Sequence, residues 1–381
     1  MVPRMTPQQF DVIIIGAGMA GSTAAAHLAP HKRVALVEAE EAPGYHTTGR
    51  SAAMWMLNYG PPDARVLVGL SRDFLVAPPA GFAEHPLVTQ RTVIYLAPEE
   101  QRAKYEEMLA EGVGVDPLPI DAACKMVPAL RPDYAVAAAI EADGFDLDVA
   151  AIQQGFLRQL RSAGGTLALR SRAGEITLRA GGWDVHTASG TVFHAPVVIN
   201  AAGAWGDEVA ELCAGAGHGL SPRRRTVVIA RPGQPVGRDW PVVADVAETW
   251  YFKPEAGALL MSPGDETAVP PGNARPDPSD VALTLERVNA VTTLALRSVR
   301  TSWAGLRTFA PDRMPVVGPH PDEPALFSFV GQGGYGVQMA PALAQAGAEL
   351  FRTGTLGDAA LAASIAPRRL RSPGPPTSPP S

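Results

Sequence analysis

The sequence has little of several things on which particular protein classes depend. Only two cysteines, Cys124 and Cys213, occur in 381 residues, which excludes a disulfide framework and leaves no thiol cluster for a structural zinc site. Basic residues are not in excess, because 32 Lys and Arg stand against 38 Asp and Glu, a net charge of -6. Proteins that mainly bind nucleic acid or anionic lipid are usually basic. The composition therefore favours a reducing, cytoplasmic location and argues against both partners.

Long apolar runs are also missing. The longest weakly polar stretch, 12–26, is interrupted by glycines and is shorter than the roughly 20 residues of a membrane-spanning helix. Residues 1–9 lack the apolar core of a signal peptide. What is present is 46% hydrophobic and only 18% charged residues, which suffices for one large α/β domain or for two domains. We expect no integral membrane segment.

A glycine fingerprint near the N-terminus predicts a dinucleotide site. A β-branched run, 10–15, precedes Gly16, Gly18 and Gly21, and an alanine-rich helical segment, 22–29, follows. The first glycine permits a tight turn, the second lets the backbone approach a pyrophosphate, and the third allows close packing of helix on strand. The free N–H groups at the helix N-terminus then face the anion.

The next strand ends in an acid of the expected kind. Residues 33–37 form a second apolar run, and Glu38 follows it, 17 residues after Gly21. A carboxylate at this point can accept hydrogen bonds from the ribose hydroxyls of a dinucleotide. Strand, glycine turn, helix, strand and acid together make a βαβ unit that binds a dinucleotide.

The course of the chain after this unit favours FAD over NAD. Regular βαβ units do not continue; instead, 43–53 is rich in glycine and small hydroxyl residues and is suited to lie along a long cofactor. Buried strands resume at 197–203 and again near Gly331. A nucleotide fold that is interrupted by a substrate domain is the layout of a flavoprotein. Further helices are predicted at 99–112, 149–163, 280–296 and 337–351, and further strands within 166–192 and at 226–230, 250–253, 259–262 and 325–330.

Several separated motifs, in order, resemble the D-amino-acid oxidase/dehydrogenase family of flavoproteins, and within it most closely the D-arginine dehydrogenases. They are the fingerprint, 44–53, 78–87, 200–205, 222–226, 303–307 and 331–336. The resemblance implies an α/β fold in which a Rossmann-like FAD-binding domain, 1–85, 148–220 and 305–366, is interleaved with a mainly antiparallel-sheet substrate domain, 86–147 and 221–304. Residues 367–381, rich in Pro, Ser and Arg, are predicted to be a disordered tail.

The resemblance also implies which residues bind FAD. They are Gly16, Gly18, Ala20, Gly21, Glu38, Ala39, His46, Thr47, Thr48, Gly49, Arg50, Ser51, Ala52, Ala53, Ala173, Ala202, Gly203, Trp205, Gly331, Gly333, Gly334, Tyr335, Gly336, Val337 and Gln338.

An arginine is the candidate anchor for a substrate carboxylate, because a planar guanidinium can hold a carboxylate with two parallel hydrogen bonds. Arg307 lies in an otherwise apolar segment, and the resemblance implies that it is this anchor. Arg225 is the second candidate, although a solvated basic turn explains it nearly as well. Tyr59 and Tyr251 match tyrosines that line the family's substrate pocket, and ordinary packed tyrosines are the alternative for both.

The remaining substrate-site predictions concern the substrate side chain. In the D-arginine dehydrogenases a glutamate faces the basic end of the substrate, and the matching position here is Val93, which cannot pair with a cation. Another acid, Glu84 or Glu248, or a shifted strand register, is the alternative. Met54, which stands where the closest relatives have a histidine, and Gln338 complete the predicted substrate site.

No Ser-His-Asp set, metal-ligand spacing or paired carboxylates occur, so we predict no catalytic side chain and no metal. The resemblance implies oxidation of a D-amino acid at the flavin to an imine that water hydrolyses to a 2-oxo acid and ammonia, with a preference for apolar or aromatic side chains. The electron acceptor is oxygen or a quinone-type compound. The alternatives are a glycine or sarcosine oxidase, a 2-hydroxy-acid dehydrogenase, or a flavin-binding protein without turnover. His46 is predicted to contact the cofactor rather than to act as a base.

Overall fold

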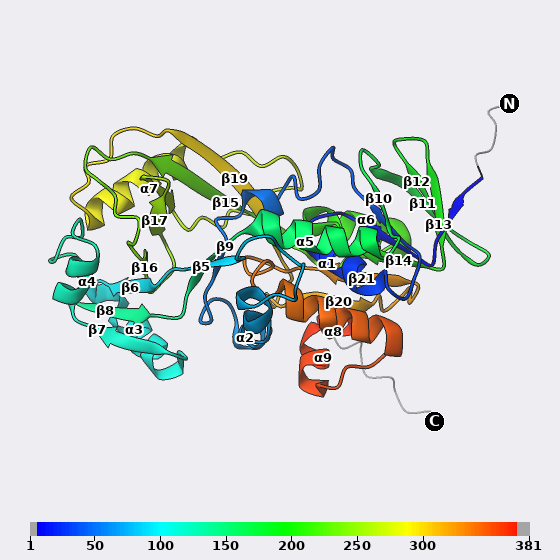
Figure 1. The fold of residues 1–381 in the computed structure, drawn as a ribbon, viewed down its shortest axis with the longest axis horizontal. Helices are drawn as coiled ribbons and strands as arrows, with labels where there is room; N and C mark the ends of the chain where they lie inside the picture. The colour runs from blue at the N-terminus through cyan, green and yellow to red at the C-terminus, as the bar shows by residue number, and fades with distance from the viewer. Residues whose placement is uncertain (1–5, 372–381) are drawn as a thin grey trace, which may run out of the picture.

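The computed structural model describes residues 6–371. The molecule is elongated, with a six-stranded sheet and its helices at one end and an eight-stranded sheet at the other (Figure 1). Strands of both sheets come from well-separated parts of the sequence, as the resemblance predicts. The α/β fold class is confirmed.

The six-stranded sheet is the one that the glycine fingerprint predicts. Its order is β10-β3-β2-β14-β21-β20, with every neighbouring pair parallel except β20 and β21. The segments predicted to resume the nucleotide fold pair directly with the first strand, since Ile15 lies opposite Asn200 and Asn200 lies opposite Ser328. The strands are β10 (Thr166–Ala168), β3 (Val34–Val37), β2 (Val12–Ile15), β14 (Val197–Asn200), β21 (Leu326–Val330) and β20 (Val316–Pro319).

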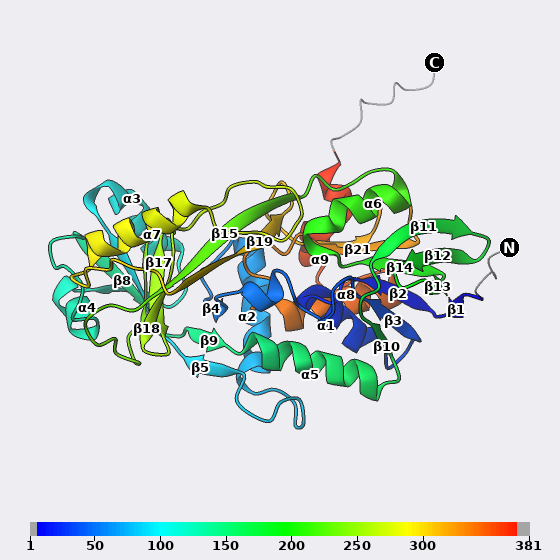
Figure 2. The same cartoon turned by 90° about the horizontal axis from the view of Figure 1, so that it is seen from above.

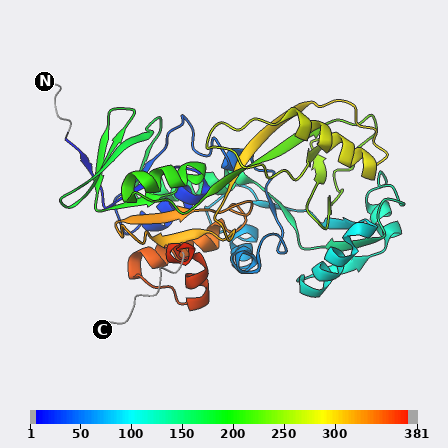
Figure 3. The same ribbon diagram turned by 180° about the vertical axis from the view of Figure 1, so that it is seen from behind.

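Both faces of this sheet are covered, which explains the unbroken apolar run of β2. Val12 and Ile14 face a core formed with helices, whereas Ile13 and Ile15 face α6 and a four-stranded sheet. The helices of the first face are α1 (Met19–Leu28), α2 (Pro62–Val76), α5 (Val149–Ser162), α8 (Ala340–Thr353) and α9 (Ala359–Ile365), and Figure 3 shows α8 and α9 beneath the sheet. On the second face lie α6 (Gly206–Ala214), β1 (Gln8–Gln9), β11 (Ala173–Arg179), β12 (Gly182–Thr187) and β13 (Val192–Ala195).

The eight-stranded sheet is mainly antiparallel, in the order β19-β15-β18-β17-β16-β6-β8-β7. Its longest strands, β15 and β19, lie side by side and reach toward the six-stranded sheet (Figure 2). The strands are β19 (Thr301–Phe309), β15 (Ser221–Ala230), β18 (Ala258–Ser262), β17 (Tyr251–Glu255), β16 (Val242–Asp245), β6 (Val93–Ala97), β8 (Ala137–Glu141) and β7 (Val115–Leu118). Helices α3 (Arg102–Glu111), α4 (Ile120–Met126) and α7 (Pro278–Val291) pack on it. Within the described range, no helix is both long and apolar enough to cross a membrane.

The remaining elements are short. A three-stranded sheet consists of β4 (Met54–Trp55), β9 (Phe145–Leu147) and β5 (Val88–Gln90), and the 3-10 helices are η1 (Thr48–Arg50), η2 (Glu99–Gln101), η3 (Gly203–Trp205) and η4 (Pro367–Leu370). Helix α2 has no counterpart among the predicted elements, because Gly69 lies within it and glycine is a poor helix former. Helix α7 ends five residues earlier than predicted, because Ala295 has a φ of +50° and the Asn289 side chain binds the backbone of Leu296.

The chain stays ordered beyond residue 366, where the sequence predicts the start of a disordered tail. Residues 367–370 form η4, and Pro367 is buried. Arg369 Nε lies 2.6 Å from Asp312 Oδ2, and Arg371 pairs with Asp322. These two ion pairs correct the prediction for 367–371. The rest of the predicted tail, 372–381, lies outside the described residues.

Candidate active site

One cavity lies where the two sheets meet. The carboxyl ends of the parallel strands β2, β3, β14 and β21 contribute one side, where ligands of open α/β sheets bind. One face of the eight-stranded sheet contributes the other, with Val93, Arg225, Tyr251 and Arg307. The cavity therefore joins the predicted cofactor residues to the predicted substrate residues.

The first and third glycines of the turn are packed so closely that no larger residue fits there. Gly16 has a φ of +102°, and a Cβ there would lie 2.5 Å from the Ala201 carbonyl oxygen. A Cβ on Gly21 would lie 1.8 Å from the Gly16 carbonyl oxygen, which is the close packing predicted for the third glycine. Gly18 lines the cavity just before the N-terminus of α1. Backbone N–H groups and the helix dipole at this point suit a pyrophosphate.

Glu38 ties this turn to the second strand. Its Oε2 accepts a hydrogen bond of 2.7 Å from Ala17 N, and its Oε1 accepts one of 2.9 Å from Glu40 N. The residue is 9% exposed and lines the cavity. Each carboxylate oxygen has further lone pairs. Glu38 can therefore fix the glycine turn and still accept from a ribose hydroxyl.

Replacing Glu38 should weaken cofactor retention. We expect Glu38→Ala to cost roughly 1.5–3 kcal/mol of FAD binding, because the variant loses hydrogen bonds of a charged, buried acceptor. The dissociation constant of FAD, measured by titrating the apoprotein, checks this. The control is Glu41→Ala, whose exposed carboxylate pairs only with Arg170 on the surface. Equal FAD affinity in the two variants would contradict the role of Glu38.

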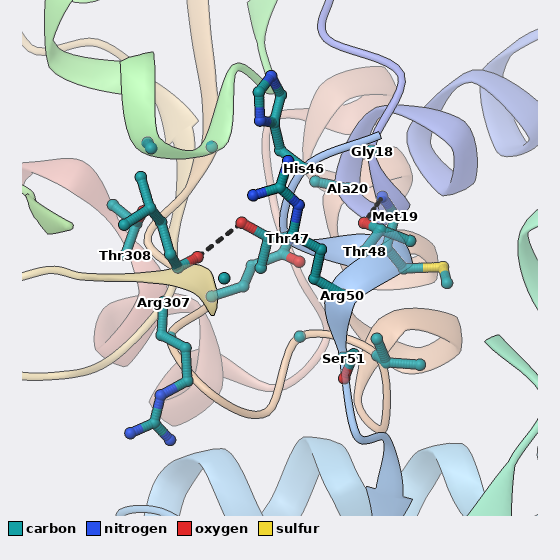
Figure 4. A pocket seen from close by; sticks show the side chains of 18 of the residues that line it. Gly18, Met19, Ala20, His46, Thr47, Thr48, Arg50, Ser51, Arg307 and Thr308 are labelled. Atoms are coloured by element: carbon teal, nitrogen blue, oxygen red, sulfur yellow. Dashed lines mark hydrogen bonds between the residues drawn. The ribbon is translucent and has the colours of Figure 1, made fainter. Parts of the chain in front are cut away.

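The 44–53 segment joins the glycine turn to the substrate sheet. Thr48 Oγ1 accepts from Met19 N at 3.0 Å, at the start of α1. Thr47 Oγ1 donates to the Leu306 carbonyl oxygen at 2.6 Å, next to Arg307 (Figure 4). Arg50 Nη1 donates to the carbonyl oxygen of Ala304 on the same strand. In Figure 4 the Arg307 guanidinium points away from this segment, toward another part of the same cavity.

Several buried polar atoms of the cavity have no hydrogen-bond partner among residues 6–371. Bound FAD would provide hydrogen-bond partners for such atoms. His46 Nδ1, Gln332 Nε2, Gln338 Nε2 and Arg307 Nε are such atoms of residues that line the cavity. Buried polar atoms are seldom left without hydrogen bonds. His46 Nε2 lies 2.9 Å from Glu40 Oε1, and its ring lies 4.7 Å from the Trp205 ring. The glycine turn, the acid and these unpartnered polar atoms together fit a long polar dinucleotide.

Most predicted site residues line this cavity. All seven predicted substrate residues do, and so do all predicted cofactor residues except Gly21, Gly49 and Tyr335. Gly49 lies behind the wall, where a Cβ would come within 2.7 Å of the Gly44 carbonyl oxygen. Tyr335 is only 2% exposed, packs its ring near Tyr59, and donates its hydroxyl to a backbone carbonyl. Gly21, Gly49 and Tyr335 are thus packed next to lining residues, and their contact with FAD stays a prediction.

Strand register explains how distant residues reach the substrate side. Val93 lies opposite Val242, and Tyr95 lies opposite Ala244, which in turn lies opposite Tyr251. Directly paired residues share one face of a sheet, so all five side chains face the cavity. With Met54 and Met56 they form one apolar cluster. Sequence reasoning missed Met56, Tyr95, Val242 and Ala244, and alternation along 93–97 was the one signal that could have revealed Tyr95.

The two arginines lie on the same sheet face. Arg223 pairs with Arg307 in the register and Arg225 pairs with Gly305, so Arg225 is the diagonal neighbour of Arg307. Arg225 donates to the Asp265 and Gly264 carbonyl oxygens at 2.9 and 3.1 Å. Arg307 donates to the Tyr59 hydroxyl, and its buried Nε has no partner among the described residues. The Nε–H group of Arg307 is therefore a donor available to a ligand.

The tyrosines beside these arginines are kept neutral. Burial raises the pKa of the Tyr59 phenol well above its usual value and also raises the pKa of the Tyr251 phenol, so both retain their protons at neutral pH. Since the Tyr59 oxygen accepts from Arg307, its own proton is free to be donated. Arginines and phenols at this end of the cavity provide donors for a carboxylate.

Two acids are the alternative sources of charge for a basic substrate. Glu84, one alternative source of charge for a basic substrate, is exposed and does not line the cavity. Glu248, the other, does line it, has a φ of +55°, and makes no side-chain hydrogen bond within residues 6–371. Burial raises the pKa of the Glu248 carboxyl, and Arg225 is the largest opposing influence. Glu248 therefore lies near the arginine end of the cavity.

A comparison with models of protein families shows the family to which the chain belongs. The model of the DAO family, described as FAD dependent oxidoreductase, matches residues 11–350. The chain belongs to this family. This FAD-dependent oxidoreductase family is the one that the motifs predict, so both the family resemblance and the choice of FAD as cofactor are confirmed.

Individual relatives match this FAD-dependent oxidoreductase over only part of its length or at low sequence identity. A bovine protein, FAD-dependent oxidoreductase domain-containing protein 1 (Bos taurus), is 33% identical over 177 residues, which are 42% of this chain and 36% of that protein. The chain thus matches about a third of the bovine protein's length. Glycine oxidase from Geobacillus kaustophilus has a TM-score of 0.79 at 23% identity, covering 92% of this chain and 96% of its own. L-proline dehydrogenase from P. horikoshii has a TM-score of 0.81 at 20% identity, covering 96% and 98%.

Proposed function

We propose that this FAD-dependent oxidoreductase converts D-amino acids to 2-oxo acids and ammonia, with a preference for apolar or aromatic side chains. The observation that carries the proposal is the division of one cavity into two ends. Arg307, Arg225 and the Tyr59 phenol form one end, an apolar cluster around Val93 forms the other, and Tyr251 packs against that cluster. An α-amino acid with an apolar side chain has the same two ends.

The chain's own residues bind and orient the substrate. The Arg307 guanidinium holds the carboxylate, Arg225 adds positive charge, and the Tyr59 and Tyr251 hydroxyls donate to the remaining lone pairs. FAD held by the glycine turn and the 44–53 segment would supply the acceptor for a hydride from Cα. The amine, as its neutral form, contributes its lone pair as the hydride leaves, which yields an imine that water hydrolyses. This chemistry needs positioning more than a protein base.

The apolar end sets the preference for the substrate side chain. Val93 is 1% exposed and lies among Met54, Met56 and Tyr95. Burying apolar surface there gains about 25 cal/mol per Å². An ammonium or guanidinium in the same place would lose hydration at a cost of several kcal/mol unless an acid paired with it. The acid opposite Val93 in the register, Glu141, already accepts from the Tyr95 hydroxyl and from Leu57 N.

Turnover of a substrate panel tests the proposal. We expect kcat/KM to be highest for D-Met, D-Phe or D-Leu, lower for D-Arg and D-Lys, and negligible for the L enantiomers. Sarcosine, glycine and a 2-hydroxy acid represent the alternative activities on this fold. Parallel assays with oxygen and with a quinone-type dye identify the acceptor. Highest activity on sarcosine, glycine or the hydroxy acid, or no activity at all, would contradict the proposal.

A further inference from the structure

The Arg307 guanidinium is bound by a carboxylate side chain of the protein itself. Glu266 follows β18, and its Oε1 accepts a hydrogen bond of 2.6 Å from Arg307 Nη2. The same oxygen lies 3.0 Å from Arg313 Nη2 and 3.5 Å from Arg225 Nη2, and Oε2 accepts from Arg313 Nη1 at 3.0 Å. Three guanidinium groups thus converge on one acid, which the proposed reaction does not use.

Glu266 approaches Arg307 from behind the substrate cavity. It lines a second, charged cavity together with Arg313 and Asp280, whereas Arg307 lines only the main cavity. Arg225 and Glu248 line both cavities and mark the boundary between them. A substrate carboxylate that enters the main cavity therefore need not displace Glu266.

The segment that carries Glu266 is fastened to β15. Asp265 accepts from Thr226 N at 2.7 Å and from Thr226 Oγ1 at 3.0 Å. On the other side of Glu266, Arg224 N donates to the Thr267 carbonyl oxygen at 2.8 Å. Since β15 is also the strand that pairs with β19, Glu266 and Arg307 are held in a fixed relation by the same two strands.

We propose that Glu266 is a positioning residue that orients Arg307 for the substrate carboxylate, an inference that rests on the proposed function. Nη2 bonded to Glu266 and Nη1 bonded to Tyr59 fix the plane of the guanidinium, and Nε stays unpartnered within the described chain. An arginine side chain has much rotamer freedom to lose on binding a ligand. Glu266 removes that freedom in advance and also neutralises part of the charge of the three arginines.

The test measures carboxylate binding directly, with isobutyrate as a carboxylate that the enzyme cannot deaminate. Its Kd follows from the change in the absorbance of the bound FAD in the holoenzyme. We expect Glu266→Ala to raise this Kd, and the KM for D-Met, by about tenfold with kcat changed much less, since only preorganisation of binding is lost. Glu266→Gln keeps an oxygen acceptor and should have a smaller effect. The matched control, Asp280→Asn, removes an acid of the second cavity that pairs with Arg224 and should leave the Kd unchanged.

A double variant distinguishes positioning from a general loss of structure. In an Arg307→Ala background, Glu266→Ala should cause no further rise in Kd, because the group that it orients is gone. An unchanged or tighter Kd in Glu266→Ala, or an equal further rise in the double variant, would overturn the inference while leaving the proposed function intact. If Arg307→Ala alone left isobutyrate binding unchanged, the carboxylate anchor of the proposed function would itself be wrong.

Discussion

Arg307→Ala is expected to lower kcat/KM for every amino acid substrate by on the order of 10²-fold or more, in a protein that remains folded and yellow. The variant would leave the substrate carboxylate in a buried cavity without its main partner. Folding should survive, because Glu266 keeps its two hydrogen bonds to Arg313. Steady-state kinetics and the absorbance of bound FAD check both parts of this expectation.

Two further variants serve as controls for Arg307→Ala. Arg307→Lys keeps the charge but loses the planar fork, so its kcat/KM should lie between those of the wild type and the alanine variant. Arg300→Ala removes an exposed arginine just before the same strand and should behave as wild type. Near-normal kinetics in Arg307→Ala would show that the ion pair with Glu266 is its whole role.

Val93→Glu is expected to reverse the preference for the substrate side chain. A carboxylate at the apolar end would pair with an ammonium or guanidinium group, so the relative kcat/KM for D-Lys and D-Arg should rise. The relative kcat/KM for D-Leu and D-Phe should fall, because a polar group then faces their apolar side chains. The ratio of kcat/KM values between D-Arg and D-Leu is the measurement.

A neutral variant of the same size is the control for Val93→Glu. Val93→Gln introduces similar bulk without charge, so it should lower activity on D-Leu without favouring D-Arg. If wild-type enzyme already preferred D-Arg or D-Lys, the apolar pocket would be wrong and Glu248, which also lines the cavity, would be the acid to replace.

The cofactor half of the site could be predicted from sequence because its signals are local. Gly16, Gly18 and Gly21 lie within six residues, and their packing follows from the strand before them and the helix after them. The acid at Glu38 follows the next strand at the expected spacing. Motif order along the chain then sufficed to predict that later strands join the same sheet.

The substrate half depends on contacts that no local pattern records. Tyr95, Ala244 and Tyr251 meet only because β6, β16 and β17 are neighbours in one particular register. Glu266 lies 41 residues before Arg307 in the sequence, in a segment without a regular element, and its hydrogen bonds depend on how that segment is fastened to β15. Local sequence patterns reveal neither the order of the strands in this sheet nor the path of the segment that carries Glu266.

The most direct test of the proposed reaction is anaerobic mixing of the oxidised holoenzyme with D-Met, α-deuterated D-Met and L-Met. D-Met should abolish the yellow absorbance of bound FAD, α-deuterated D-Met should do so more slowly because the Cα–H bond breaks, and L-Met should leave the absorbance unchanged. Yellow absorbance that persists with D-Met and other apolar D-amino acids, or that is lost equally fast with L-Met, would contradict the account.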